Sequence, residues 1–261
     1  TPYPTLSLHD ALPISRAIST PQPGDLRTEA VVLLHGWYSS PIPMKRLEWA
    51  LRREGYRVFN PSYRSIRVPL ATLASEYLPD YLQRTIPDDL QRIHFVTHSM
   101  GGLLLRGCLA AHRPANLGRV VFLGPPHPGS EAADFWSKSA FCRWLAGPNL
   151  ASLQTGPAGY SVTLGPADYE ALVIAGDRPL SPFWSPLPAP HDGKVSVAST
   201  RLAGSARHVV VPHTHVALPI RTEIIRQIVQ FLRGGDAGLH AQPQRQAPFR
   251  ANPSRQTAPL Q

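Results

Sequence analysis

The stretch that decides the fold is Ile93–Leu105, which reads I-H-F-V-T-H-S-M-G-G-L-L-L. An apolar run ends at Val96, a polar triplet follows, and a glycine pair leads into an apolar segment that favours a helix. This order predicts a strand, a tight elbow and a helix. A serine at such an elbow is held in a strained backbone conformation that exposes its hydroxyl, and the N–H groups of the following helix point at the same place. Ser99 is therefore the candidate nucleophile, and Gly101 and Gly102 allow the helix to approach the strand closely.

A simpler interpretation of Ser99 is an N-cap residue on a buried helix. The rest of the chain favours the nucleophile, because strands and helices alternate on both sides of this stretch. Apolar strands are expected at 30–34, 56–60, 93–96, 119–123, 171–175 and 208–211, and helices at 43–54, 69–85, 100–112 and 223–232. The alternation predicts an α/β fold with a doubly wound, mostly parallel sheet of about six strands. Such a sheet binds ligands beyond the carboxyl ends of its strands, where Ser99 falls.

The length of 261 residues fits one α/β domain with a well-buried core, expected over residues 30–234. Residues 1–15 resemble the translation of a sequencing-library adapter and are left out of the fold, and residues 16–29 are expected to lead into it. On this interpretation the natural N-terminus lies outside the sequence, so the compartment is left open, with the cytoplasm as the default expectation. Residues 235–261 are rich in Pro, Gln, Ala and Arg without apolar periodicity, which predicts a disordered tail.

The formal net charge of +9 does not predict a nucleic-acid partner. The positive residues are scattered along the chain and nearly all are Arg, since Lys45, Lys138 and Lys194 are the only lysines. Together with the many Pro and Ala residues, this pattern indicates GC-rich coding bias. Cys108 and Cys142 imply no disulfide framework. No apolar stretch approaches the length that crosses a bilayer, so we expect no integral membrane segment, and nothing in the sequence assigns an oligomeric state.

Three motifs mark the ends of expected strands and the loop before the last one: H-G-W at 35–37, T-H-S-M-G-G at 97–102 and D-G-K-V at 192–195. These motifs resemble those of the α/β-hydrolase superfamily, and most closely those of its small bacterial lipases and esterases with a shortened sheet. The likeness extends to chain order, because a nucleophile, an acid and a histidine follow one another as in that superfamily. Similar proteins also carry a segment like G-P-P-H-P-G-S-E at 124–131. The sequence departs at Thr97, where the elbow of the superfamily has glycine.

The resemblance implies a serine hydrolase that cleaves carboxylic esters through an acyl-enzyme intermediate, without a metal or other cofactor. Such a reaction needs a base beside the nucleophile. The loop after the last expected strand offers His213 and His215, and the position of the histidine in similar proteins favours His215. An H-x-H pair is also a metal-ligand pattern, but no paired motif elsewhere supplies the further ligands of a zinc site.

Two aspartates compete for the group that orients the histidine. Asp177 directly follows an expected strand, whereas Asp192 lies in a turn sequence before the last strand. The D-G-x-V segment of similar lipases favours Asp192. Asp177 is alternatively a turn or N-cap residue paired with Arg178, and Asp192 an ordinary Asp-Gly turn.

The donors for the oxyanion are expected to be the backbone N–H groups of Trp37 and Met100, which follow the first strand and the nucleophile respectively. The contacts are made by the main chain, so the side chains do not identify them. His35 and His98 are expected to be hydrogen-bonding residues of the two turns rather than general bases.

The substrate pocket is expected to include a lid or pocket insertion at about 125–170. Trp136, Ala140 and Trp144 are spaced four residues apart, which predicts one apolar helical face that either roofs the pocket or packs on the core. Phe183 and Trp184 are expected in another wall. These aromatic residues favour a small-molecule or lipid ester with an apolar acyl group. The alternatives are other acyl-transfer chemistry, on thioesters, amides, phospholipids or alcohols, and a catalytically silent binding protein.

Overall fold

Six strands form one sheet in which every neighbouring pair is parallel, in the order β2-β1-β3-β4-β5-β6. The computed structural model describes residues 25–180 and 187–235, and the strands are β1 (Glu29–Leu34), β2 (Arg57–Phe59), β3 (Arg92–His98), β4 (Leu117–Leu123), β5 (Ala167–Gly176) and β6 (Gly204–Val211). The strand order reverses direction along the chain at β1 and β3, as in a doubly wound sheet. The predicted α/β fold is confirmed.

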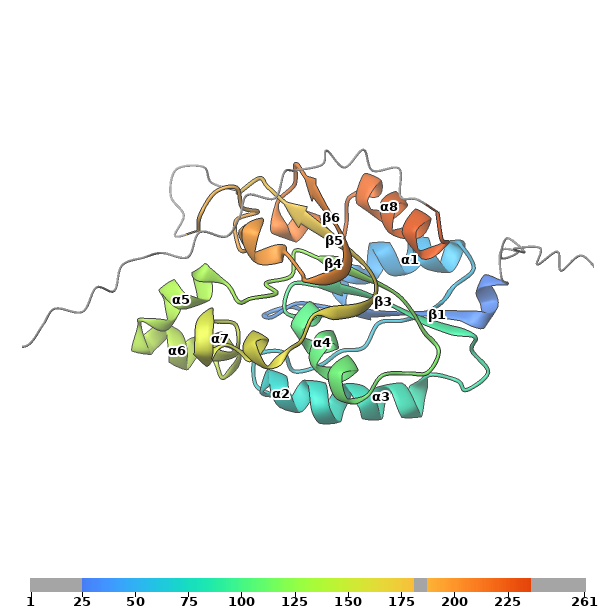
Figure 1. Ribbon diagram of the computed structural model, residues 1–261, viewed down its shortest axis with the longest axis horizontal. Coiled ribbons are helices and arrows are strands. Elements are labelled where there is room, and N and C mark those ends of the chain that lie inside the picture. The colour runs from blue at the N-terminus through green and yellow to red at the C-terminus, as the bar shows by residue number, and fades with distance from the viewer. Residues whose placement is uncertain (1–24, 181–186, 236–261) are drawn as a thin grey trace, which may run out of the picture.

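Helices cover both faces of the sheet (Figure 1). One face packs against α1 (Lys45–Arg53) and α8 (Thr222–Leu232), and the other against α2 (Leu70–Thr72), a π-helical turn (Leu73–Tyr77), α3 (Leu78–Thr85) and α4 (Gly101–Ala111). Every residue of β1 is buried: Val32 and Leu34 join the core under α4, whereas Val31 and Leu33 join the core under α1 and α8. Because both faces are covered, this strand shows no alternation of polar and apolar residues.

Strands β3, β5 and β6 extend furthest beyond the predicted apolar runs. β3 continues through Thr97 and His98, and Thr97 fits the buried strand because its hydroxyl lies within hydrogen-bonding distance of the Val121 carbonyl oxygen, at 3.4 Å. β5 begins at Ala167 and β6 at Gly204. The first half of β5 alternates between buried and exposed residues, so polar side chains there face water and hide the strand from an apolar pattern.

The prediction of one helical face through Trp136, Ala140 and Trp144 is wrong. Two helices occupy the segment, α5 (Glu131–Ser137) and α6 (Ala140–Ala146), followed by α7 (Asn149–Ser152). Ser139 has an extended backbone and its side chain accepts the Cys142 N–H, at 3.3 Å, so it caps a new helix. The two tryptophans therefore do not share a helix, and they are 47% and 78% exposed rather than packed in the core.

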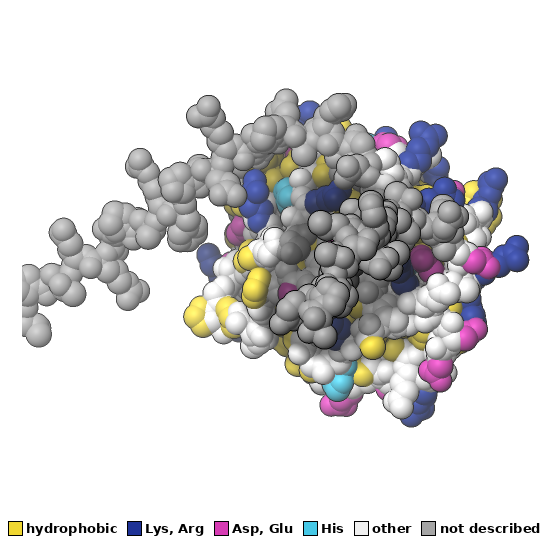
Figure 2. Space-filling view, turned by 45° about the vertical axis from the view of Figure 1, so that its right-hand side comes forward, with side chains coloured by type: hydrophobic (Ala, Val, Ile, Leu, Met, Phe, Trp, Pro, Cys, Tyr) yellow, Lys and Arg dark blue, Asp and Glu magenta, His cyan; other side chains and the backbone are white. Residues whose placement is uncertain are grey.

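The expectations for the two ends of the chain lie outside the described residues, as do Phe183 and Trp184. Within residues 25–180 and 187–235, no helix is long and apolar enough to span a bilayer. On the face shown in Figure 2, the dark-blue Lys and Arg side chains lie among magenta Asp and Glu side chains rather than in one continuous patch. This arrangement agrees with the scattered positive residues of the sequence.

Candidate active site

Ser99 lies at the turn between β3 and α4, with a φ angle of +55°. A positive φ is costly for a residue with a side chain, and among the described non-glycine residues only Tyr38 shares it. The turn is fixed on both sides: the Ser99 N–H donates to the Leu123 carbonyl at 2.9 Å, and the Gly102 N–H donates to the Ser99 carbonyl at 2.9 Å. The strand, elbow and helix expected from the sequence are therefore present.

The two glycines after Ser99 allow α4 to begin directly against the sheet. A Cβ atom on Gly101 would lie 2.6 Å from the Leu34 carbonyl oxygen, too close for any other residue. A Cβ atom on Gly102 would lie 3.1 Å from the Phe122 ring. The N-terminus of α4 is consequently held at the carboxyl ends of β1 and β4, beside Ser99.

His215 and Asp192 form a buried pair, with 2.7 Å between Nδ1 of His215 and Oδ2 of Asp192. His215 lies in the turn that follows β6, and its backbone N–H donates to the Asp192 carbonyl at 3.0 Å. The other carboxylate oxygen of Asp192 accepts the N–H groups of Lys194 and Val195, at 2.9 and 2.8 Å. An ionised carboxylate can only accept, so the proton of a neutral His215 lies on Nδ1 and Nε2 is left as a base.

The Asp192 carboxylate is stabilised in its ionised form. Burial alone would raise its pKa, but the charge and hydrogen bond of His215 and the two backbone N–H donors outweigh burial, and its pKa lies below the ordinary value. The aspartate is therefore charged at neutral pH and holds the histidine in one orientation.

The rival residues have other partners. Nε2 of His213 lies 2.6 Å from a carboxylate oxygen of Glu223 on α8, and Asp177 forms an ion pair with its neighbour Arg178, at 3.5 Å. Of the two histidines and two aspartates that the sequence offered, the structure brings together His215 and Asp192. No group of three or more His, Cys, Asp or Glu residues within 25–180 and 187–235 is arranged to hold a metal ion.

The side chain of His98, the last residue of β3, forms a hydrogen bond with His215 rather than with its own turn. Its Nε2–H donates to the His215 carbonyl at 3.0 Å, and the two rings lie 4.7 Å apart. Burial and the nearby charge of His215 lower the pKa of His98 to about 3, so it stays neutral. His98 therefore holds the backbone of the loop that carries His215, a contact that the sequence did not reveal.

Two glycines make room for the Asp192–His215 pair, a role that the sequence analysis did not predict. A Cβ atom on Gly124, which follows β4, would lie 3.0 Å from Nδ1 of His215 and 3.1 Å from Oδ2 of Asp192. A Cβ atom on Gly176, the last residue of β5, would lie 2.8 Å from Cβ of Asp192. Their signal in the sequence is a glycine at the end of each of two neighbouring strands.

A cavity of about 500 Å³ opens in front of Ser99. Ser99 and His215 lie in its wall together with the turn of Trp37 and Tyr38 after β1 and with Trp136 of α5. The other residues of the wall are Gly36, Ser39, Pro43, His98, Pro126, Ser130, Ala132, Ala133, Leu150, Leu153, Gly193, Lys194, Val195 and Val216. Trp144, expected in the pocket, is not in this wall, because the helix break at Ser139 turns it to solvent.

Trp37 lines the cavity and Met100 directly follows Ser99, so their backbone N–H groups lie next to the candidate nucleophile along the chain or across the cavity. Within the described part of the chain, neither N–H has a hydrogen-bond acceptor. Met100 directly precedes α4, whose N-terminus carries partial positive charge. The two amides are thus candidates to bind an oxygen that develops negative charge.

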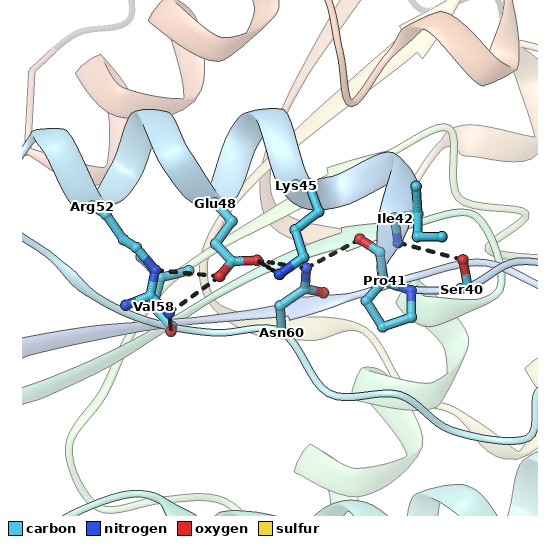
Figure 3. Close-up of polar contacts among 8 residues, drawn as sticks. All are labelled: Ser40, Pro41, Ile42, Lys45, Glu48, Arg52, Val58 and Asn60. Carbon is cyan, nitrogen blue, oxygen red and sulfur yellow. Dashed lines mark hydrogen bonds and ion pairs between the residues drawn. The ribbon is translucent and has the colours of Figure 1, made fainter.

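The segment that follows the Trp37 turn is fixed to α1 and to the end of β2 (Figure 3). The side-chain amide of Asn60 donates to the Pro41 carbonyl at 3.1 Å and to the Glu48 carboxylate at 2.9 Å. Glu48 also pairs with Lys45 and Arg52 of the same helix. These contacts hold the backbone downstream of the turn in place.

Comparison with known proteins agrees with this architecture. The model of the alpha/beta hydrolase family matches residues 31–256. No curated protein sequence matches the chain. Among solved structures, the mature form of the Bacillus licheniformis lipase BlEst2 is similar over 77% of this chain and 88% of its own, with 21% identity and a TM-score of 0.57.

Two further solved structures are similar at the same distant level. The metagenomic carboxyl esterase MGS0156 shares 18% identity over 74% of this chain and 66% of its own, with a TM-score of 0.62. Phospholipase PlaB from Legionella pneumophila shares 20% identity over 66% of this chain, with a TM-score of 0.55, and the match spans only 44% of its length. Identity at this level is evidence of fold alone. The parallel six-stranded sheet and the family match over most of the sequence together show that the chain belongs to the alpha/beta hydrolase family.

Proposed function

We propose that this protein is a serine hydrolase that cleaves carboxylic esters through an acyl-enzyme intermediate. The observation that carries the proposal is the convergence on one cavity of Ser99, at a strained elbow, and of His215, whose Nδ1 is bonded to the buried Asp192. The distant likeness to a lipase and a carboxyl esterase supports hydrolysis as the reaction class.

In this mechanism the Ser99 Oγ attacks the carbonyl carbon of the ester while Nε2 of His215 takes the hydroxyl proton. Asp192 remains ionised and stabilises the imidazolium. The carbonyl oxygen becomes an oxyanion, which the N–H groups of Trp37 and Met100 bind. Collapse of the tetrahedral intermediate breaks the C–O bond, and the alcohol leaves with the proton from His215. A water molecule, deprotonated by the same histidine, then attacks the acyl carbon. The bond from this carbon to the Ser99 Oγ breaks, His215 returns the proton to Oγ, and the acid is released.

The wall of the cavity supports an ester with an apolar acyl group. Trp136, Leu150, Leu153 and Val216 contribute apolar surface, and Trp136 is half-exposed. The cavity volume of about 500 Å³ is within the range of ordinary small-molecule sites.

Hydrolysis of a p-nitrophenyl ester by the parent protein and by the variants Asp192→Asn and Asp177→Asn tests the proposal. Asp192→Asn keeps the shape of the side chain but donates a hydrogen to Nδ1, so it imposes the wrong tautomer on His215, and kcat should fall on the order of 10³- to 10⁴-fold. Asp177→Asn is the matched control, because Asp177 pairs with Arg178, and kcat should stay within about threefold of the parent value. Equal activity of the two variants, or no turnover by the folded parent protein, would contradict the proposal.

A further inference from the structure

Lys194 brings a positive charge to the wall of the candidate active site. It is the only residue with a full formal charge in the described wall of the cavity, whose other polar side chains belong to serine, histidine, tyrosine and tryptophan. No Asp or Glu of the described residues lines this cavity. The ammonium charge is therefore not neutralised by the wall around it.

The backbone of Lys194 is fixed beside the Asp192–His215 pair. Its N–H donates to Asp192 Oδ1 at 2.9 Å, and its carbonyl accepts the Ser130 hydroxyl at 3.2 Å. Both backbone groups of the residue are thus held by groups of the site, so the residue stays in the wall of the cavity.

Two carboxylates belong to residues next to these contacts, and Lys194 pairs with neither: Oε2 of Glu131 is buried and has no hydrogen-bond partner among the described residues. Asp192 binds His215 and two backbone N–H groups. One oxygen of Glu131 accepts the hydroxyls of Ser196 and Ser199, both at 2.9 Å. Among residues 25–180 and 187–235, Lys194 forms no ion pair. An exposed cation that pairs with no carboxylate and lines the same cavity as Ser99 is available to a negatively charged ligand.

We propose that Lys194 binds an anionic group of the ester substrate, a phosphate or a carboxylate, so that the preferred substrates are esters that carry a negative charge. This inference rests on the ester hydrolase activity proposed above and adds the substrate class. The anionic group belongs either to a small soluble ester or to the headgroup of a lipid.

Paired anionic and neutral substrates measure the effect of the negative group. The soluble pair is the mono-p-nitrophenyl ester of glutaric acid and its neutral methyl ester. The lipid pair is lysophosphatidylglycerol and a monoacylglycerol with the same acyl chain. For each pair, the ratio of kcat/KM for the anionic ester to kcat/KM for the neutral ester is measured in each variant, which removes any general loss of activity from the comparison.

Three variants test the role of the charge. Lys194→Met should lower the ratio about tenfold or more, because a hydrogen bond to a charged partner is lost, and Lys194→Arg should keep it within about threefold. Lys138→Met removes the same charge from the end of α5, outside the cavity wall, and should leave the ratio unchanged. A raised salt concentration should lower the ratio in the parent protein, because ions screen the attraction.

The outcomes separate the inference about Lys194 from the proposed ester hydrolase activity. A lower ratio in Lys194→Met for the soluble pair supports a small anionic ester, and a lower ratio for the lipid pair alone supports a lipid headgroup. If neutral esters are cleaved and the kcat/KM ratio is the same in the parent and in Lys194→Met, the inference about Lys194 is overturned. An equal fall of this ratio in Lys138→Met overturns it as well. In both cases the proposed ester hydrolysis stands. Failure to cleave any of the four esters, with no covalent labelling of Ser99, contradicts both proposals.

Discussion

The hydroxyl of Tyr38 donates a hydrogen bond to the carbonyl of Leu145, at 2.6 Å, across 107 positions of the sequence. Tyr38 follows Trp37 in the turn after β1, has a φ angle of +52°, and packs its ring edge-to-face on the Trp37 indole with 5.0 Å between centroids. Leu145 lies near the end of α6, beyond the cavity. The contact therefore connects the turn that carries one candidate oxyanion donor to the helical segment of α5–α7 (Figure 1).

Tyr38→Phe should slow turnover more than it weakens the fold. The bond is exposed, so its loss should lower the free energy of unfolding by no more than about 1 kcal/mol. Loss of one oxyanion donor lowers the rate about 10²- to 10³-fold. Loosening the turn that positions the Trp37 N–H should have a smaller effect, a fall in kcat of about three- to tenfold. The measurements are kcat, KM and the melting temperature.

Tyr77→Phe is the control for that variant, because the Tyr77 hydroxyl also donates to a backbone carbonyl, that of Ser62, at 2.9 Å and away from the cavity. A fall in kcat of the same size in both variants would show that Tyr38 does not position the turn.

Trp136→Ala should weaken the preference for longer acyl chains, whereas Trp144→Ala should not. Trp136 lines the cavity, and each methylene of the acyl chain that it buries contributes up to about 0.8 kcal/mol. Trp144 is outside the cavity wall and 78% exposed. The test is kcat/KM over a p-nitrophenyl series from acetate to palmitate. A parent protein that prefers acetate, or equal flattening by both replacements, would contradict an acyl pocket under Trp136.

Much of the sheet was predictable because its strands are buried on both faces. The apolar runs at 30–34 and 119–123 needed no knowledge of their neighbours. The ends of strands were less predictable, since Thr97 extends its strand by pairing with Leu34 and Phe122 of the neighbouring strands, which a local pattern does not show. The break between α5 and α6 depends on one capping contact, from Ser139 to the Cys142 N–H, which competes with an apolar spacing that suits a longer helix.

The candidate site was predictable to the extent that local sequence encodes it. The glycines after Ser99 indicate an elbow from the sequence alone, and the positive φ follows. The choice between Asp177 and Asp192 rests on which aspartate reaches His215, a matter of tertiary structure. The contact of His98 with the His215 carbonyl and the close approach of Gly124 to His215 also depend on tertiary structure, since each brings together segments far apart in the chain.

The fold should become less stable as pH falls below about 6.5. Burial lowers the pKa of His98 to about 3 and that of His208 to about 4, whereas an unfolded histidine titrates near 6.5. Between these values the unfolded chain binds protons that the folded one does not, so stability is full above pH 6.5 and declines toward pH 4. At pH 5 the titration of His98 alone should lower the free energy of unfolding by about 2 kcal/mol relative to its value at neutral pH.

Urea unfolding at a series of pH values measures this effect, with His98→Gln as the comparison. The variant keeps a side-chain N–H for the His215 carbonyl but does not titrate, so its stability should depend less steeply on pH. A slope equal to that of the parent would show that His98 is not a buried neutral histidine.

The most direct test of the account is covalent labelling by a fluorophosphonate, followed by intact mass and peptide mapping. The folded parent protein should gain one phosphonyl group, on Ser99, and Ser99→Ala should gain none. His215→Ala should slow labelling by at least about 10²-fold, because the hydroxyl loses its base. His213→Ala, which removes a histidine paired with Glu223, should label at nearly the parent rate. A folded parent protein without an adduct on Ser99, or equal slowing by the two histidine variants, would contradict the central claim.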